Sequence, residues 1–130
     1  MLPQGAEWLA LLAGVHAADY QFLEISIDES DERLARFQWP SARCHEPHEA
    51  LDANPVKIDT MCLCDHRRLA LRSVSKDWRE KALTNMRHAI AFAAEFNLRF
   101  VQVAGFDVHY EPSTEDTRRL YLEVILRSAQ

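Results

Sequence analysis

The stretch VKIDTMCLC, residues 56–64, decides the fold class of this 130-residue chain. Polar and apolar residues alternate through most of it, which predicts a β-strand. It is followed by DWREKALTNMRHAIAFAAEF at 77–96, a predicted amphipathic helix, and by RFVQVAG at 99–105, a further predicted strand. A strand, a helix and a second strand in this order predict a βαβ unit with parallel strands.

The ends of the predicted helices carry typical start and stop residues. Asp77 followed by Glu80 predicts a capping box, and Asn97 accepts the left-handed conformation that ends many helices. A final helix over 112–130 is predicted to begin with Ser113 as its cap. The buried stripe of the 77–96 helix is predicted to consist of Trp78, Ala82, Met86, Ala93 and either Ile90 or Ala89.

Two further elements are predicted toward the amino terminus. The segment AEWLALLAGVHAA at 6–18 has apolar residues at helical spacing, and YQFLEISID at 20–28 alternates as a strand does. The run DESDERLARFQW at 28–39 is expected to form a loop with a short helical turn. In SARCHEPHEALDANP at 41–55, Pro47 would break a helix interior, so a helix is expected only from Pro47 to about Ala53.

Taken together, these patterns predict an α/β domain with about three parallel strands and three to four helices. A chain of this length suits one domain, and residues 1–130 contain no low-complexity linker. Three strands are too few for most closed α/β folds, so the sequence is interpreted as part of a larger architecture.

The composition and charge of the chain argue against some classes of binding partner. The formal net charge of −5 argues against general binding to nucleic acid or to a membrane surface, since either favours a basic face. No apolar run approaches the roughly 20 residues that span a bilayer. The amino terminus has no basic lead, so a signal peptide is not expected. Three cysteines, an odd number, favour the reducing cytoplasm.

The stretch MCLCDHRR, residues 61–68, raises the possibility of a metal site. On an extended segment Cys62, Cys64 and His66 would point the same way, and Cys44 lies nearby in sequence together with two histidines. A structural zinc site usually needs a fourth ligand and favours a two-residue gap between cysteines. The favoured interpretation is therefore the end of a buried strand, with Cys62 as a small hydrophobic residue.

Four stretches, FLEISIDESDERLAR at 22–36, MCLCDHRR at 61–68, MRHAIAFA at 86–93 and VQVAGFDVHY from 101, resemble a known family. They are similar to the first half of the L-xylulose-5-phosphate (L-ribulose-5-phosphate) 3-epimerases, also described as hexulose-6-phosphate isomerase-like, in the xylose isomerase-like superfamily. The resemblance implies a partial (β/α)8 TIM barrel. The chain would hold barrel strands two to four, and would lack strand one and strands five to eight.

The resemblance also implies a reaction. A 3-epimerase removes a proton beside the C2 carbonyl of a pentulose phosphate and returns one to the opposite face through an enediolate. In relatives of the family a divalent metal (Mn, Mg or Zn) is held by two glutamates, an aspartate and a histidine of strands five to eight. No residue of this chain matches any of these ligands, so neither catalytic nor metal-binding residues are expected on it.

A substrate-facing rim is still expected, because active sites of such barrels lie at the carboxyl ends of the strands. Glu24 is expected to face the barrel interior, or to hydrogen-bond a neighbouring strand. His66 and Arg67 follow the next strand, where a guanidinium suits sugar or phosphate oxygens. Asp107 and Tyr110 follow Gly105, whose missing side chain permits a tight turn or a close backbone approach. These five polar residues are the predicted substrate-binding set.

The chain departs from the family pattern in several places. Asp19 and Asn97 stand where the family usually has glycine, and HRRLALRS replaces HRRFPLGS, with Ala70 and Arg72 in place of a proline and a glycine. These changes resemble the drift of a gene fragment. One reading is an epimerase by descent. The alternative is a catalytically inactive fragment, or a half-barrel that needs a complementing chain, and either is expected to self-associate through exposed barrel edges. A zinc-dependent nuclease of the same superfamily is a third reading, against which the acidic charge counts.

Overall fold

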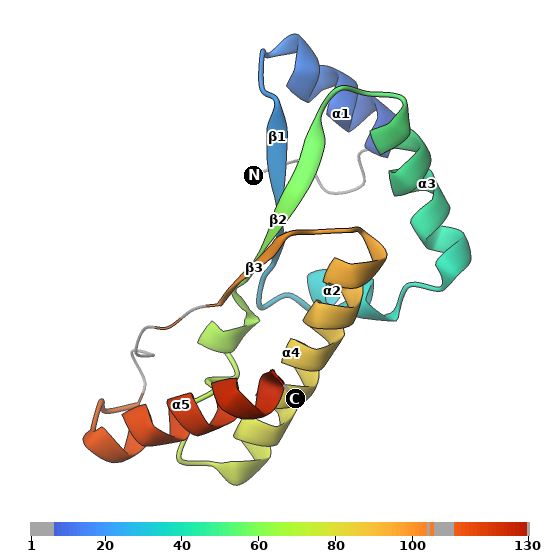
Figure 1. The fold of residues 1–130 in the computed structure, drawn as a ribbon. Helices are drawn as coiled ribbons and strands as arrows, with labels where there is room; N and C mark the ends of the chain where they lie inside the picture. The colour runs from blue at the N-terminus through green and yellow to red at the C-terminus, as the bar shows by residue number, and fades with distance from the viewer. Residues whose placement is uncertain (1–6, 104, 106–110, 130) are drawn as a thin grey trace.

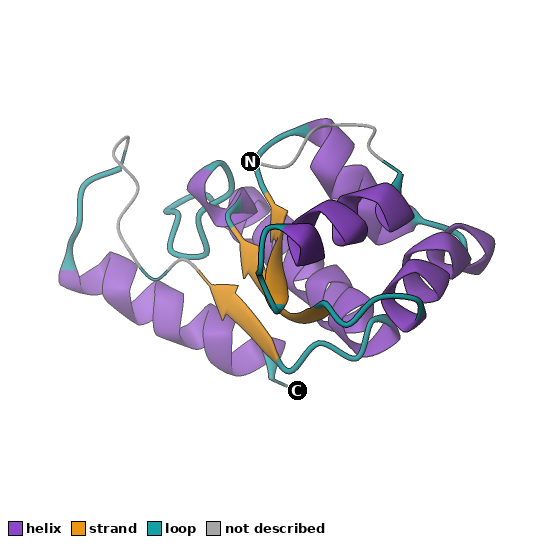
Figure 2. Ribbon diagram, turned by 90° about the horizontal axis from the view of Figure 1, so that it is seen from above, coloured by secondary structure: helices purple, strands orange, loops and turns teal. Residues whose placement is uncertain are grey.

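The computed structural model describes residues 7–103, 105 and 111–129. Within them, β1 (Phe22–Ile27), β2 (Lys57–Leu63) and β3 (Phe100–Val103) form one parallel sheet in that order. Seen from above, the strands lie side by side as an open sheet (Figure 2). The predicted strands and their parallel pairing are confirmed, and an open sheet of parallel strands joined by helices agrees with the partial (β/α)8 barrel that the resemblance implies.

Helices connect the strands and cover one face of the sheet. In the part of the chain that the structure describes, none of them is both long and apolar enough to cross a membrane. The α-helices α1 and α3 lie side by side at one end of the molecule, and α5 crosses α4 at the other (Figure 1). Their bounds are α1 Trp8–Ala17, α2 Asp31–Leu34, α3 Ser41–Asp52, α4 Lys76–Glu95 and α5 Glu115–Ser128, with short 3-10 helices η1 Ala35–Gln38 and η2 Asp65–Arg67.

The main hydrophobic core lies between the sheet and α4. Alternate residues of β1 and β2 point to this side, because successive side chains of a strand face opposite ways. The buried residues of this core include Ile25, Ile27, Met61, Leu63, Leu83, Met86, Ala89, Phe92 and Ala93. The stripe of α4 therefore contains Ala89, while Ile90 and Trp78 are exposed.

A second, smaller cluster lies between α1, α3 and the start of β2. It consists of Leu12, Val15, Ala50 and Val56. Trp8, Leu23 and Leu51 are partly buried and contact both clusters. The amino-terminal helix is thus connected to the main core through only a few side chains.

The expectation for the segment around Pro47 was wrong, because α3 begins at Ser41 and contains the proline in its interior. An interior proline removes one backbone hydrogen bond and costs about 3 kcal/mol. Packing offsets this cost here, since Cys44, Pro47 and Ala50 form a buried face of α3. The sequence rule described the local penalty correctly and could not include the tertiary contacts.

Two helix starts also differ from the predicted ones. The cap of α4 is Ser75, whose hydroxyl accepts a hydrogen bond from the Trp78 N–H, so Asp77 lies within the first turn. Thr114, and not Ser113, caps α5 in a reciprocal pair with Thr117. All of these residue types are good caps, so sequence alone could not select among neighbours.

In the described part of the chain, two non-glycine residues have a left-handed backbone conformation. Asp19 has a φ of 63° after α1, and Asn97 has a φ of 51° after α4. The predicted role of Asn97 at the helix end is confirmed. Aspartate and asparagine are among the non-glycine residues that best tolerate this conformation.

Candidate functional site

The carboxyl ends of β1 and β2 meet in one rim. The Cys64 N–H donates to the Ile27 carbonyl at 2.8 Å, which extends the pairing of the strands by one bond. Beyond it, Arg68 Nη1 donates to the Glu29 carbonyl and to Asp31 Oδ1, each at 3.0 Å. These bonds therefore connect the segment after β2 with the loop after β1 at the exposed surface.

The face of the sheet that points away from α4 is polar at its centre. The strand register places Glu24 opposite Thr60, and Ser26 opposite Cys62, which in turn lies opposite Gln102. Glu24 accepts a hydrogen bond from the Thr60 hydroxyl at 2.9 Å. The carboxylate thus has a partner on the neighbouring strand and is also exposed to solvent. A structural role and a ligand-facing role are both compatible with this position.

The loop after β1 is organised by Asp28 and Ser30. Asp28 Oδ1 accepts from the Ser30 N–H at 2.9 Å and from its hydroxyl at 2.6 Å, and Ser30 caps α2. Burial alone would raise the pKa of Asp28, but these bonds and the charges of Arg33 and Arg36 outweigh it, so the pKa is lowered. Arg33 is itself buried and donates to the Ser26 carbonyl. The motif therefore fixes the shape of the rim.

Arg67 is exposed at the carboxyl end of β2 and lies near Cys62. The pKa of the Cys62 thiol is raised to about 11, first by burial and then by its hydrogen bond with Cys64, while the charge of Arg67 acts in the opposite direction. This influence shows that the guanidinium lies close to the Cys62 thiol. Its position suits contact with an anionic ligand above the sheet.

His66, a predicted substrate residue, does not lie on the exposed surface. Its ring is 3% exposed, and Nε2 lies 3.3 Å from the Ala82 carbonyl of α4. Burial lowers the pKa of this histidine to about 4, although the bond to Ala82 acts against the shift. The ring is therefore neutral at physiological pH. In this structure His66 anchors η2 to α4, directly beneath the exposed Arg67.

Asp65 is a buried residue of the rim that the sequence analysis did not select. Its carboxylate accepts a hydrogen bond from Asn85 Nδ2 of α4. Burial raises the pKa of Asp65, against the opposing effects of Asn85 and Arg68. The useful signal in the sequence was an aspartate followed by histidine directly after an apolar strand. Burial of an aspartate and a histidine is unfavourable unless residues of another element form hydrogen bonds with them.

Arg72, one of the departures from the family pattern, is a buried anchor. Its Nη1 donates to the Pro112 carbonyl at 3.1 Å and to Thr117 Oγ1 at 3.0 Å, and Nη2 donates to the Glu111 carbonyl at 3.0 Å. Beside it, Ser73 donates to Glu111 Oε1 at 2.6 Å. The segment after η2 is thereby fastened to the start of α5.

The third part of the predicted rim follows β3. The expected close approach at Gly105 is present, because a Cβ added there would lie 3.2 Å from the Tyr121 hydroxyl oxygen. Asp107 and Tyr110 lie outside the described residues. In the described part of the rim, Glu24 is exposed on the polar face of the sheet and Arg67 lies close to Cys62, while the His66 ring is buried against α4.

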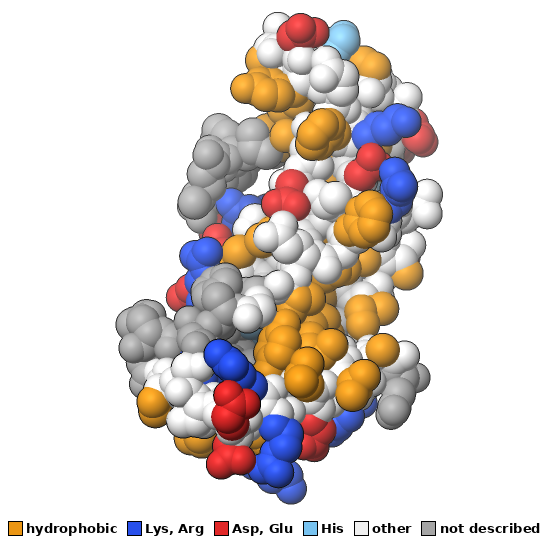
Figure 3. All heavy atoms as spheres, turned by 60° about the vertical axis from the view of Figure 1, so that its left-hand side comes forward, with side chains coloured by type: hydrophobic (Ala, Val, Ile, Leu, Met, Phe, Trp, Pro, Cys, Tyr) orange, Lys and Arg blue, Asp and Glu red, His pale blue; other side chains and the backbone are white. Residues whose placement is uncertain are grey.

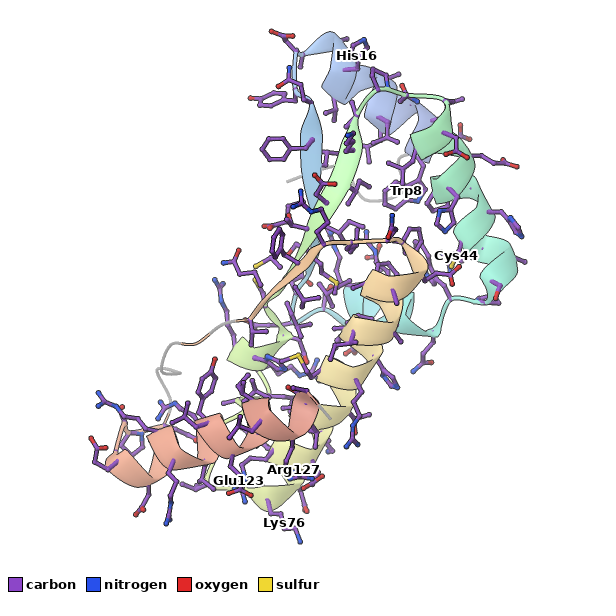
Figure 4. All side chains as sticks on the ribbon, viewed as in Figure 1. Trp8, His16, Cys44, Lys76, Glu123 and Arg127 are labelled. Atoms are coloured by element: carbon purple, nitrogen blue, oxygen red, sulfur yellow. The ribbon has the colours of Figure 1, made fainter. Side chains whose placement is uncertain are left out.

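The donor atoms do not form a complete metal site. Within residues 7–103, 105 and 111–129, no three His, Cys, Asp or Glu side chains are grouped to hold an ion. Cys62 and Cys64 have their sulfur atoms 3.2 Å apart, but His66 points into the core, and Cys44 is buried on α3 (Figure 4). The described residues thus do not fit the carboxylate and histidine set that the resembling family implies.

Comparison with known proteins gives a consistent assignment. Residues 12–130 match the family described as xylose isomerase-like TIM barrel. Over 129 residues the chain is 36% identical to the L-ribulose-5-phosphate 3-epimerase UlaE of Escherichia coli O139:H28 and of Shigella sonnei. The protein of the same name from Shigella boydii serotype 18 is also 36% identical. Each comparison covers 99% of this chain and 45% of the relative, so the chain spans about half their length.

Proposed function

This chain belongs to the xylose isomerase-like TIM barrel family, and we propose that it provides the substrate-facing half of a sugar-phosphate 3-epimerase. The observation that carries the proposal is 36% identity to L-ribulose-5-phosphate 3-epimerases across almost the whole chain. The proposed substrate is a pentulose phosphate, L-ribulose 5-phosphate or L-xylulose 5-phosphate. The free state of its three cysteines supports a cytoplasmic location for this metabolic role.

The role proposed for each residue follows from its position in the rim. Arg67 contacts the phosphate or the sugar oxygens, and Glu24 accepts hydrogen bonds from the sugar on the polar face of the sheet. His66 acts as a positioning residue that holds η2, and Asp107 and Tyr110 complete the set after β3. The proton transfers and a divalent metal are assigned to the part of the family barrel that this chain does not match. On its own the chain is therefore proposed to be inactive.

The first test is a chimera in which this chain replaces the equivalent half of the Escherichia coli relative. The chimera is expected to interconvert the two pentulose phosphates, whereas the isolated chain is not. In the chimera, Arg67→Ala should lower kcat/KM by about tenfold or more, which corresponds to about 1.4 kcal/mol of binding. Arg118→Ala is the control, since Arg118 pairs with Glu115 on the exposed surface of α5 and should leave kcat/KM nearly unchanged.

Three results would contradict parts of this proposal. A folded chimera without turnover would show that this half cannot serve the epimerase reaction. Equal losses in the Arg67 and Arg118 variants would remove the assigned role of Arg67. Turnover by the isolated chain would contradict its proposed dependence on a second half, while leaving the epimerase assignment standing.

We also propose that the isolated chain self-associates through its open sheet. β1 and β3 are the outer strands of the described sheet, and Phe22 and Phe100 at their starts are 66% and 60% exposed. Figure 3 shows a face of the molecule on which hydrophobic side chains gather in an open patch. Exposed strand edges and apolar patches of this kind favour association.

Light scattering across a dilution series tests the self-association. The chain is expected to dimerise, and the double change of Phe22→Ser and Phe100→Ser should weaken the dimer by at least about tenfold, because each phenylalanine contributes roughly 1.5–3 kcal/mol when buried. Leu9→Ser, on the exposed side of α1, is the matched control. A monomer at every concentration would refute the proposal.

A further inference from the structure

Cys62 and Cys64 form a close pair of thiols at the end of β2. Alternate residues of a strand are separated by about 6.6 Å along its axis, so their sulfur atoms need not meet. Here Cys64 leaves the extended conformation, with φ −85° and ψ −9°, and the chain turns into η2. The two sulfur atoms lie 3.2 Å apart.

The position of the pair is fixed and accessible. The Cys64 N–H donates to the Ile27 carbonyl at 2.8 Å, which holds the turn against β1. Both cysteines are partly exposed, whereas Cys44 is buried on α3. Neither thiol is needed for the proposed epimerase chemistry.

We propose that Cys62 and Cys64 are a thiol-oxidation site that forms a reversible intramolecular disulfide by exchange with a low-molecular-weight disulfide such as oxidised glutathione. The separation of Cα atoms two residues apart on a strand, at most about 6.7 Å, lies within the range that a disulfide spans. The sulfur atoms then move from 3.2 Å to a bond of about 2.05 Å.

The exchange takes place in two balanced steps. The Cys64 thiolate attacks one sulfur of oxidised glutathione, which forms a mixed disulfide and releases one glutathione thiolate. Cys62 then loses its proton to solvent and attacks the Cys64 sulfur, which displaces the second glutathione thiolate. The two protein thiols are oxidised by two electrons, and one molecule of oxidised glutathione is reduced to two thiols. The raised pKa of Cys62 is consistent with Cys64 attacking first.

The test is oxidation of the full chain by oxidised glutathione, followed by peptide mass spectrometry. The natural chain and the Cys44→Ser variant should lose two hydrogen atoms in the peptide that contains both cysteines, and a dithiol reductant should restore them. Cys62→Ser and Cys64→Ser should instead retain a mixed disulfide with glutathione. In the folded chain the disulfide should be at least about tenfold more stable than in urea, which is about 30 mV in reduction potential.

Each other outcome would overturn the proposal. A stable glutathione adduct on the natural chain would show that the second sulfur cannot reach the first. Disulfides between chains would place the pairing elsewhere. Free thiols that persist, under conditions that oxidise a control dithiol peptide, would exclude the exchange. Equal disulfide stability in the folded chain and in urea would show that the fold does not bring the thiols together. Circular dichroism of each serine variant checks that its fold is retained.

Discussion

Replacing Arg72 by methionine is expected to lower the free energy of unfolding by about 3 kcal/mol or more. The side chain is 4% exposed, and its guanidinium donates to two carbonyls and to the Thr117 hydroxyl. Methionine fills much of the same volume but donates no hydrogen bond, so these acceptors would lose their partner. Urea denaturation of the natural and variant chains measures the difference through the transition midpoint.

Replacing Arg72 by glycine provides a second and more discriminating variant. If Arg72 were the neutral result of drift, Arg72→Gly would leave the stability unchanged, whereas the structure predicts a loss at least as large as for methionine. Arg127→Met is the matched control, because Arg127 binds Glu80 between α5 and α4 in a half-exposed ion pair (Figure 4). Its loss should be clearly smaller. Similar losses in both would contradict the anchoring role of Arg72.

The free energy of unfolding is expected to fall by about 2 kcal/mol between about pH 8 and about pH 5 because of His66 alone. In the folded chain burial lowers its pKa from 6.5 to about 4. The unfolded chain therefore binds a proton in a range where the folded chain does not. The stabilising contribution is complete above pH 6.5 and is lost as the pH falls toward 4.

The pH dependence of stability that His66 produces must be distinguished from that of the neighbouring Asp65. Burial raises the pKa of Asp65, so its contribution has the opposite sign and is lost as the pH rises through the folded pKa. His66→Gln keeps a polar side chain and removes the titration, and its stability should decline less steeply with falling pH. His16→Gln at the exposed end of α1 is the control for loss of an imidazole (Figure 4). Identical slopes in the natural chain and His66→Gln would refute the assignment.

The sequence predicted the strands well, because the alternation of apolar residues is preserved wherever one face of a strand is buried. Ile25 and Leu63 carry this signal, and both are buried. It predicted α3 poorly, since the local penalty of Pro47 is offset by burial that depends on α1 and on the sheet. The helix caps were misplaced by one or two residues because several suitable residues stand next to one another.

The candidate site was predicted less well, for a related reason. Spacing along a strand correctly brought Cys62 and Cys64 together. It failed for His66, because η2 rotates the chain after Cys64 and turns the ring into the core. Arg72 could not be recognised as an anchor, since its acceptors lie about 40 residues later in the chain. Contacts of that range depend on the tertiary fold.

The separate cluster between α1 and α3 has a consequence for cooperativity. Of the described hydrophobic residues of α1, Trp8 is the one packed against the main core, whereas α3 places Cys44 in that core, so α1 can open without disrupting it. Amide protons of α1 would then exchange with solvent through local opening, while those of β2 and α4 would exchange only through global unfolding. The molecule is in this sense two foldons, and its amino-terminal unit sets the lower limit of its native-state protection.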